Sequence, residues 1–151
     1  MQLCGNALAG DLRLDILRLH HMGFVVSDIE TAIPAFVSSL GAQWEQRIFD
    51  DPYQRVRVTF LTTRPGDPQI ELVQPLGDNS PVMRFLRQRS GGLHHACYEV
   101  PNVDEQLLKF RSRGALIVKR PRPAAAFGGR NIAWVLTAEK LLIELLQESA
   151  S

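Results

Sequence analysis

Two histidines and two glutamates recur at matching positions in the two halves of the chain. The segment LHHMGFVV at 19–26 returns as LHHACYEV at 93–100, and IELVQ at 70–74 returns as IELLQ at 143–147. Each copy therefore places a histidine roughly fifty residues before a glutamate. Imidazole nitrogens and carboxylate oxygens are common ligands of first-row divalent metals. The repeat predicts a site in which two histidines and two glutamates hold one divalent metal ion.

The repeat also limits which side chains can meet. Side chains alternate along a strand, so only one histidine of each pair can face the concave side of a sheet. His21 and His95 occupy equivalent positions, and His20 and His94 are equivalent to each other on the opposite face. Each of the two glutamates is flanked by apolar residues, in a strand expected to be buried. An isolated carboxylate is costly there, and a metal ion would remove that cost for both.

The elements that position these residues follow one order in each copy: a strand, a helix and three strands. Ser27 and Asp28 are candidate N-caps of the first helix, which ends at Gly41, and Pro34 predicts that this helix is bent or starts late. The second helix is expected at 103–113, and a short linking helix opens at Ser80-Pro81. The expected strands cover 19–26, 43–49, 55–62 and 68–74, then 93–100, 115–120, 130–136 and 141–147.

Composition excludes several classes of protein. The 151 residues, 45% hydrophobic and 22% charged, fit one ordinary globular domain, which follows an N-terminal extension at 1–17. A net charge of +1 without a basic cluster predicts no nucleic-acid partner. No apolar run is long enough to span a membrane. Cys4 and Cys97 lie far apart without a disulfide framework, which predicts reduced thiols in a cytoplasmic protein.

The motifs above resemble the vicinal oxygen chelate superfamily, which has the glyoxalase fold. The resemblance covers residues 18–148 and implies the α+β fold class. Two βαβββ modules, 18–75 and 92–148, would be related by a pseudo-twofold axis and form a cupped mixed-sheet barrel around one metal ion. In that family the ligands come from the first and last strands of each module, and these positions map here onto His21, Glu71, His95 and Glu144.

The second histidine of each pair is chosen from the family's His-hydrophobic-small-aromatic pattern, with His20 or His94 as the alternative. Within the superfamily, IELVQPLGDNSP at 70–81 and the Phe-Leu and Gly-Leu-His-His groups of 85–95 resemble methylmalonyl-CoA epimerases. Two features depart from them. The turn before the last strand lacks their His-Pro-Lys pattern, and 56–60 supplies no second carboxylate.

The resemblance implies a metal-dependent isomerase or epimerase that acts at a carbon next to a carbonyl. The substrate would be an acyl thioester of coenzyme A or an acyl carrier protein, reacting through a metal-stabilised enolate. Glu144 and Glu71 are the expected catalytic bases, and substrate-binding residues stay unknown. The ligand set suits Ni, Co, Mn, Zn or Fe. Arg120, Arg122 and Arg130 flank the glycine loop and could meet phosphates.

The alternatives are a glyoxalase I-like lyase, a ring-cleaving dioxygenase and a non-catalytic small-molecule-binding protein. Bacterial-type glyoxalase I carries an Arg and an Asn for glutathione where this chain has Val25 and Pro75, so lactoylglutathione is the poorer match. The dioxygenase usually has one glutamate fewer, and the binding proteins lack the ligand set. The resemblance further implies a homodimer.

Overall fold

The computed structural model describes residues 16–150, and the expected order of elements occurs in it twice. The first module comprises β1 (Arg18–Val25), α1 (Ile29–Leu40), β2 (Gln43–Asp51), β3 (Val56–Thr62) and β4 (Gln69–Pro75). After α2 (Met83–Arg89), the second module comprises β5 (Gly92–Val100), α3 (Val103–Ser112), β6 (Leu116–Pro123), the 3-10 helix η1 (Ala125–Phe127), β7 (Asn131–Leu136) and β8 (Leu142–Gln147). Most of the predicted extension at 1–17 lies outside the described residues.

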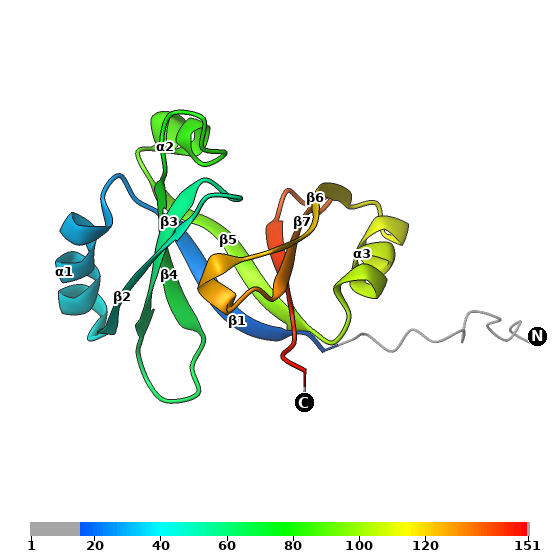
Figure 1. Cartoon of the computed structure of the whole chain (residues 1–151), viewed down its shortest axis with the longest axis horizontal. Helices are drawn as coiled ribbons and strands as arrows, with labels where there is room; N and C mark the ends of the chain where they lie inside the picture. Colours follow the sequence, from blue (N-terminus) through cyan, green and yellow to red (C-terminus); the bar gives the residue numbers. More distant parts are fainter. Residues whose placement is uncertain (1–15, 151) are drawn as a thin grey trace, which may run out of the picture.

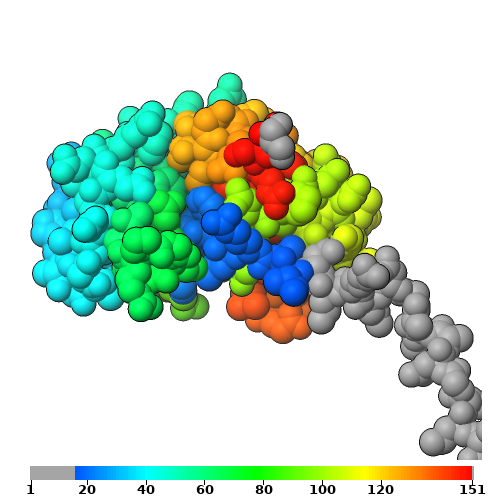
Figure 2. Space-filling model, turned by 90° about the horizontal axis from the view of Figure 1, so that it is seen from below, coloured from blue at the N-terminus to red at the C-terminus, as the bar shows by residue number. Residues whose placement is uncertain are grey.

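The described strands form one mixed sheet in the order β2-β3-β4-β1-β5-β8-β7-β6. Within each module the first and last strands are parallel neighbours (β1 with β4, β5 with β8), and antiparallel pairing of β1 with β5 joins the modules. Figure 1 shows α1 and α3 at opposite ends of the molecule. Figure 2 shows β1, in blue, where the first module meets the second. These features confirm the α+β fold of two βαβββ modules, with a cupped sheet that stays open between the edge strands β2 and β6.

Each main helix packs its apolar side against its own module. Ile29 and Ile33 of α1 belong to a buried cluster with Leu61 and Leu72 of β3 and β4. The second module has an equivalent cluster, formed by Val103, Leu107, Ala133, Val135 and Leu145 with their neighbours. Burying one such aliphatic side chain contributes about 1.5–3 kcal/mol, so these contacts fix each helix on its strands. None of the described helices is long and apolar enough to cross a membrane.

The first helix begins where its cap residue predicts. Asp28 Oδ2 accepts a hydrogen bond from the Thr31 backbone N–H at 2.8 Å, and α1 starts at Ile29, so the late start considered for this helix is wrong. Pro34 lies in the helix interior on its exposed side, where water can reach the Glu30 carbonyl that loses its partner. The short helix starts later than expected, at Met83.

A glutamine at the end of each module ties the sheet to the start of its helix. The Ile29 N–H donates to Gln74 Oε1 at 2.9 Å, and the Val103 N–H donates to Gln147 Oε1 at 3.0 Å. The first N–H groups of a helix have no partner inside the helix, so each glutamine satisfies one of them. Each lies three residues after a glutamate of the repeat, and the helix contact therefore helps to fix the strand that carries that glutamate.

Candidate metal centre

The four residues predicted as ligands lie on the four central strands of the sheet. His21 is on β1, Glu71 on β4, His95 on β5 and Glu144 on β8, and these strands are consecutive neighbours. The side chains are almost inaccessible to solvent, since the exposed fractions of the four residues are 0%, 5%, 5% and 2% in that order. The structure therefore brings together four residues that are far apart in the sequence.

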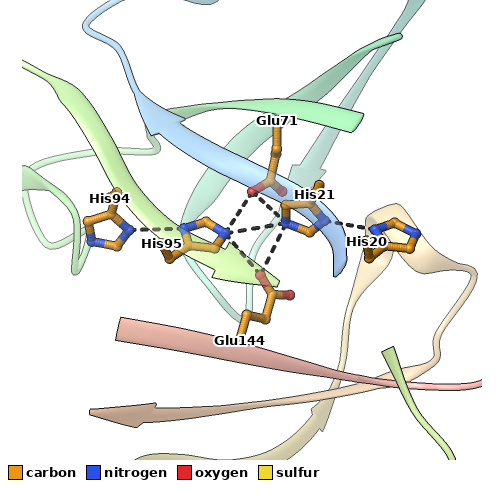
Figure 3. Close-up of polar contacts among 6 residues, drawn as sticks. All are labelled: His20, His21, Glu71, His94, His95 and Glu144. Carbon is orange, nitrogen blue, oxygen red and sulfur yellow. Dashed lines mark hydrogen bonds and ion pairs between the residues drawn. The ribbon is translucent and has the colours of Figure 1, made fainter. Parts of the chain in front are cut away.

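The side chains converge on a common point, as Figure 3 shows. Oε2 of Glu71 lies 3.2 Å from His21 Nε2 and 3.1 Å from His95 Nε2. Oε2 of Glu144 lies 3.5 and 3.1 Å from the same two nitrogens. The two Nε2 atoms are 3.3 Å apart. One atom from each residue thus lies within 4.8 Å of the other three, as donors to one cation would.

The outer histidines of the two pairs do not lie on the opposite face, as strict alternation requires. The pairing of β1 with β5 passes from Leu19–Tyr98 to His21–Cys97, which leaves His20 as an extra residue. The same shift in β5 leaves His94 extra. A β-bulge turns its extra side chain away from the regular alternation. As a result Nδ1 of His20 lies 2.8 Å from Nδ1 of His21, and the His94–His95 distance is 3.1 Å (Figure 3).

A glycine makes room for one of the inner rings. Gly23 on β1 pairs with His95 on β5, and a Cβ added at Gly23 would lie 2.0 Å from Cε1 of His95. The His95 ring therefore occupies the space that any larger residue at position 23 would take. Trp134 packs edge-on against the same ring, with centroids 4.7 Å apart. Backbone and indole together hold this ring beside the carboxylates.

The charges in the cluster stabilise one another. Burial opposes charge on the His21 ring, but the Glu71 carboxylate and hydrogen bonds raise its pKa well above the usual value. The pKa of His95 is also raised, because hydrogen bonds to Glu144 and Glu71 outweigh burial. Burial would raise the pKa of both glutamates, but the histidines lower it. The structure thus favours ionised carboxylates next to protonated rings.

The donor chemistry of this cluster fits a divalent metal ion. Two imidazole nitrogens and two carboxylate oxygens form a mixed set that such ions accept, and with both rings neutral one divalent cation balances the two carboxylates. His20, His21 and Cys97 also lie close together. Burial, together with the Glu144 charge, raises the pKa of the Cys97 thiol to about 12, which makes a thiolate ligand unfavourable there. The set of two histidines and two glutamates is therefore the better candidate.

A cavity of about 190 Å³ lies next to the cluster, and Glu71, His95 and Glu144 form part of its wall. Most of the remaining wall is apolar and comes from both modules: Val56, Val58, Val73, Val82, Phe127, Ile132 and Trp134. The 3-10 helix η1 and the residue before it contribute Ala124, Ala126 and Phe127. An apolar cavity beside convergent polar groups is the usual form of a small-molecule site.

Besides the cluster and His94, this wall holds three charged or amide side chains that the sequence did not identify. They are Asp51, Gln54 and Lys119, which carry no repeat signal. Asp51 ends β2, Gln54 lies in the turn between β2 and β3, and Lys119 lies in a bulged edge strand. Of the arginines considered for phosphate contacts, Arg130 is instead committed to Glu99, with Nη1 2.7 Å from Oε1. The sequence motifs identify the cluster, whereas the cavity depends on how the strands curl around it.

Comparison with known proteins agrees with this geometry. The family model of the Glyoxalase/Bleomycin resistance protein/Dioxygenase superfamily matches residues 20–134. The chain is 32% identical over 119 residues to an ethylmalonyl-CoA/methylmalonyl-CoA epimerase of Cereibacter sphaeroides, covering 78% of this chain and 87% of that protein. It is 34% identical over 97 residues to the mitochondrial methylmalonyl-CoA epimerase of Homo sapiens, covering 64% of this chain and 53% of that protein. The crystal structure of methylmalonyl-CoA epimerase from Mycobacterium tuberculosis has a TM-score of 0.77 and 28% identity, covering 88% of this chain and 89% of that one.

Proposed function

The chain belongs to the glyoxalase/bleomycin resistance protein/dioxygenase superfamily, and from that premise we propose that it is an epimerase of acyl-CoA thioesters such as methylmalonyl-CoA. One observation carries the proposal: His21, Glu71, His95 and Glu144 converge beside an apolar cavity. The identity of 32% to an epimerase along most of both chains supports the reaction class. Such an enzyme inverts the configuration at the α-carbon, the carbon next to the thioester carbonyl.

We assign the four converging side chains as ligands of one divalent metal ion, which would be Ni, Co, Mn, Zn or Fe. When bound, this ion would supply positive charge to polarise the carbonyl of the thioester. The burial of all four donors supports the assignment, since two ionised carboxylates beside rings that are neutral, as ligands must be, would lack a cationic neighbour without the metal ion.

We assign the two glutamates to opposite faces of the α-carbon. Figure 3 shows Glu71 and Glu144 approaching the rings from opposite sides, one from β4 and the other from β8. We assign Glu144 as the base: the α-C–H bond breaks, the proton goes to the Glu144 carboxylate, and the electron pair moves toward the carbonyl oxygen as the enolate forms. A proton returned to the other face completes the inversion. Glu71 is the candidate donor once its carboxylate, which is ionised in the resting cluster, has taken up a proton from solvent. The apolar walls keep bulk water away from the reacting carbon.

Deuterium exchange at the α-carbon tests this function. The protein, loaded with each candidate metal in turn, is incubated with one epimer of methylmalonyl-CoA in D₂O, and deuterium incorporation and epimer ratio are followed by NMR. We expect incorporation with inversion in the wild type. In Glu144→Gln we expect a loss of about 10²- to 10⁴-fold, because positioned acid–base groups contribute rate factors of that size.

The matched control is Glu139→Gln, which removes the same charge from an exposed site before β8 and should keep full exchange. Exchange that survives Glu144→Gln undiminished would remove Glu144 as the base. A wild type with bound metal but no exchange would refute the epimerase. Turnover of a hemithioacetal would then point to the glyoxalase I-like lyase, and ligand binding without turnover to a binding protein.

The assembly of the protein follows from the same proposal. We propose that residues 18–148 form one catalytic domain built from modules 18–75 and 92–148, with 1–17 as an extension, and that two copies form a homodimer in the cytoplasm. Light scattering of the purified protein measures the mass in solution. A mass near the 16.9 kDa of one chain would refute the dimer.

A further inference from the structure

A lysine lies in line with the proposed base across three strands of the second module. Glu144 on β8 pairs with Trp134 on β7, and Trp134 pairs with Lys119 on β6. Antiparallel partners point their side chains to the same face of the sheet, so the three form a row on the concave face. All three contribute to the wall of the cavity beside the metal centre. Two strand spacings, about 10 Å, separate the backbones of Lys119 and Glu144.

Lys119 has no partner that matches its charge. Its Nζ donates to the neutral Oε1 of Gln54 at 3.1 Å, and no ion pair with a carboxylate is formed within the described residues. Asp51, the carboxylate of the same wall, already accepts hydrogen bonds from the backbone N–H groups of Tyr53, Gln54 and Ala125. A half-buried ammonium with only a neutral partner would gain from a bound anion.

The surroundings of Lys119 add to its positive field. Burial lowers its pKa, as do the charges of Arg55 and Arg122, while Asp51 raises it. Among the residues that line the cavity, Lys119 is the one lysine or arginine. The first module offers no counterpart. The residues of β2 opposite Phe60 lie in an irregular stretch, and Arg47 there is exposed and stacks on Phe49 at 4.4 Å. The single cationic side chain of the cavity wall therefore comes from the second module.

We propose that Lys119 determines substrate specificity by binding a free carboxylate on the acyl group of the thioester, and this rests on the proposed function. The substrates it favours are monothioesters of dicarboxylic acids whose α-carbon lies beside Glu144. The cavity, at about 190 Å³, is smaller than the roughly 300–1,000 Å³ of pockets for drug-sized ligands. This volume suits a small acyl group better than the nucleotide part of coenzyme A. Lys119 also shares a mostly apolar wall with Glu144, so we assign the anion as the acyl carboxylate.

Three ligands separate these sources of negative charge. Methylmalonyl-CoA carries both a carboxylate and phosphates, propionyl-CoA lacks only the carboxylate, and coenzyme A lacks the acyl group. Calorimetric titration compares wild-type protein with Lys119→Met, Lys119→Arg and the control Arg113→Met, which removes an exposed charge at the end of α3. We expect Lys119→Met to lower the affinity for methylmalonyl-CoA about 10- to 100-fold. Its affinities for propionyl-CoA and coenzyme A should stay within about twofold of those of the wild type. Lys119→Arg should restore most of the preference.

Two results would overturn the inference. An equal loss of affinity for all three ligands in Lys119→Met would show that the lysine binds a phosphate of coenzyme A. Unchanged affinity for all three would show that Lys119 takes no part in ligand binding. If Lys119→Met does not fold, as judged by its circular dichroism, Lys119→Gln takes its place. The binding data also stand apart from turnover. If the wild type lacks epimerase activity but loses its preference for the carboxylate-bearing thioester in Lys119→Met, the proposed reaction fails while the role of Lys119 holds.

Discussion

The two modules carry the same inner histidine but differ in what faces each ring. Gly23 and Cys97 occupy the same position in the two halves of the repeat. In the pairing of β1 with β5, His21 lies opposite Cys97 and His95 lies opposite Gly23. The His95 ring therefore occupies the space beside Gly23, which has no side chain, while the His21 ring lies beside the thiol of Cys97. The cluster is nearly symmetric in its histidines and glutamates and asymmetric in the contacts that hold them.

The largest effect is expected from a single methyl group at the glycine. In Gly23→Ala the new Cβ would lie 2.0 Å from Cε1 and 2.5 Å from both nitrogens of the His95 ring, so the ring must move out of the cluster. We expect metal affinity to fall more than about 100-fold, since loss of a single supporting group already costs 10- to 100-fold. Competition with a chromophoric chelator measures this affinity.

The control is Gly66→Ala. A Cβ there meets nothing within 4 Å, but φ of +87° strains any larger residue, so general destabilisation occurs without a clash. We expect lower thermal stability and unchanged metal affinity in Gly66→Ala. Metal affinity in Gly23→Ala equal to that of the wild type would show that the His95 ring is not held where the structure places it.

The repeat in the sequence predicted the converging side chains better than the residues that support them. His21, Glu71, His95 and Glu144 were found because residue type and spacing recur, and the order of strands followed from periodicity and caps. The bulges at His20 and His94 were missed, because the alternation rule assumes a regular ladder and a bulge has no pattern of its own. Gly23 was visible in the repeat, but the ring that fills its space comes from the other module, which only the fold brings near.

The outer histidines are expected to have the next largest effect. For Nε2 of an inner histidine to offer a lone pair, Nδ1 must carry the proton, and Nδ1 of His20 or His94 is positioned to accept it. Burial, aided by the neighbouring ring, lowers the pKa of His20, and it lowers that of His94 to about 4, so both rings are neutral acceptors near pH 7. In His20→Phe and His94→Phe the ring shape stays and the acceptor is lost.

We expect metal affinity to fall about 10- to 100-fold in each variant, with the larger loss in His20→Phe, whose Nδ1–Nδ1 distance is shorter at 2.8 Å against 3.1 Å. Chelator competition measures the affinity, and thermal melting of the metal-free protein reports any separate loss of stability. The Nδ1 interactions would be irrelevant to the ligands if both variants bound metal as the wild type does.

The two glutamines should show a difference in stability rather than in metal binding. Gln74 accepts one backbone hydrogen bond, from Ile29, whereas Gln147 accepts one from Val103 and also donates to the carbonyl of Pro101. Leucine at either position leaves the helix N–H without its partner, which costs about 1–3 kcal/mol. Urea unfolding should therefore give a lower free energy of unfolding for Gln147→Leu than for Gln74→Leu. Equal stability of both variants with the wild type would contradict the anchoring role.

The smallest effect is expected at Cys97, the counterpart of Gly23. Its side chain is fully buried and burial raises the thiol pKa to about 12, so in a Cys4→Ser background a thiol reagent at pH 8 should label it only on unfolding. Cys97→Ala removes the sulfur without adding atoms near His21, and metal affinity should stay within about threefold of the wild type. The same chelator competition decides this. A large loss of metal affinity in Cys97→Ala would mean that the thiol is as important for placing the His21 ring as the space at Gly23 is for the His95 ring. The proposed asymmetry between the modules would then be wrong.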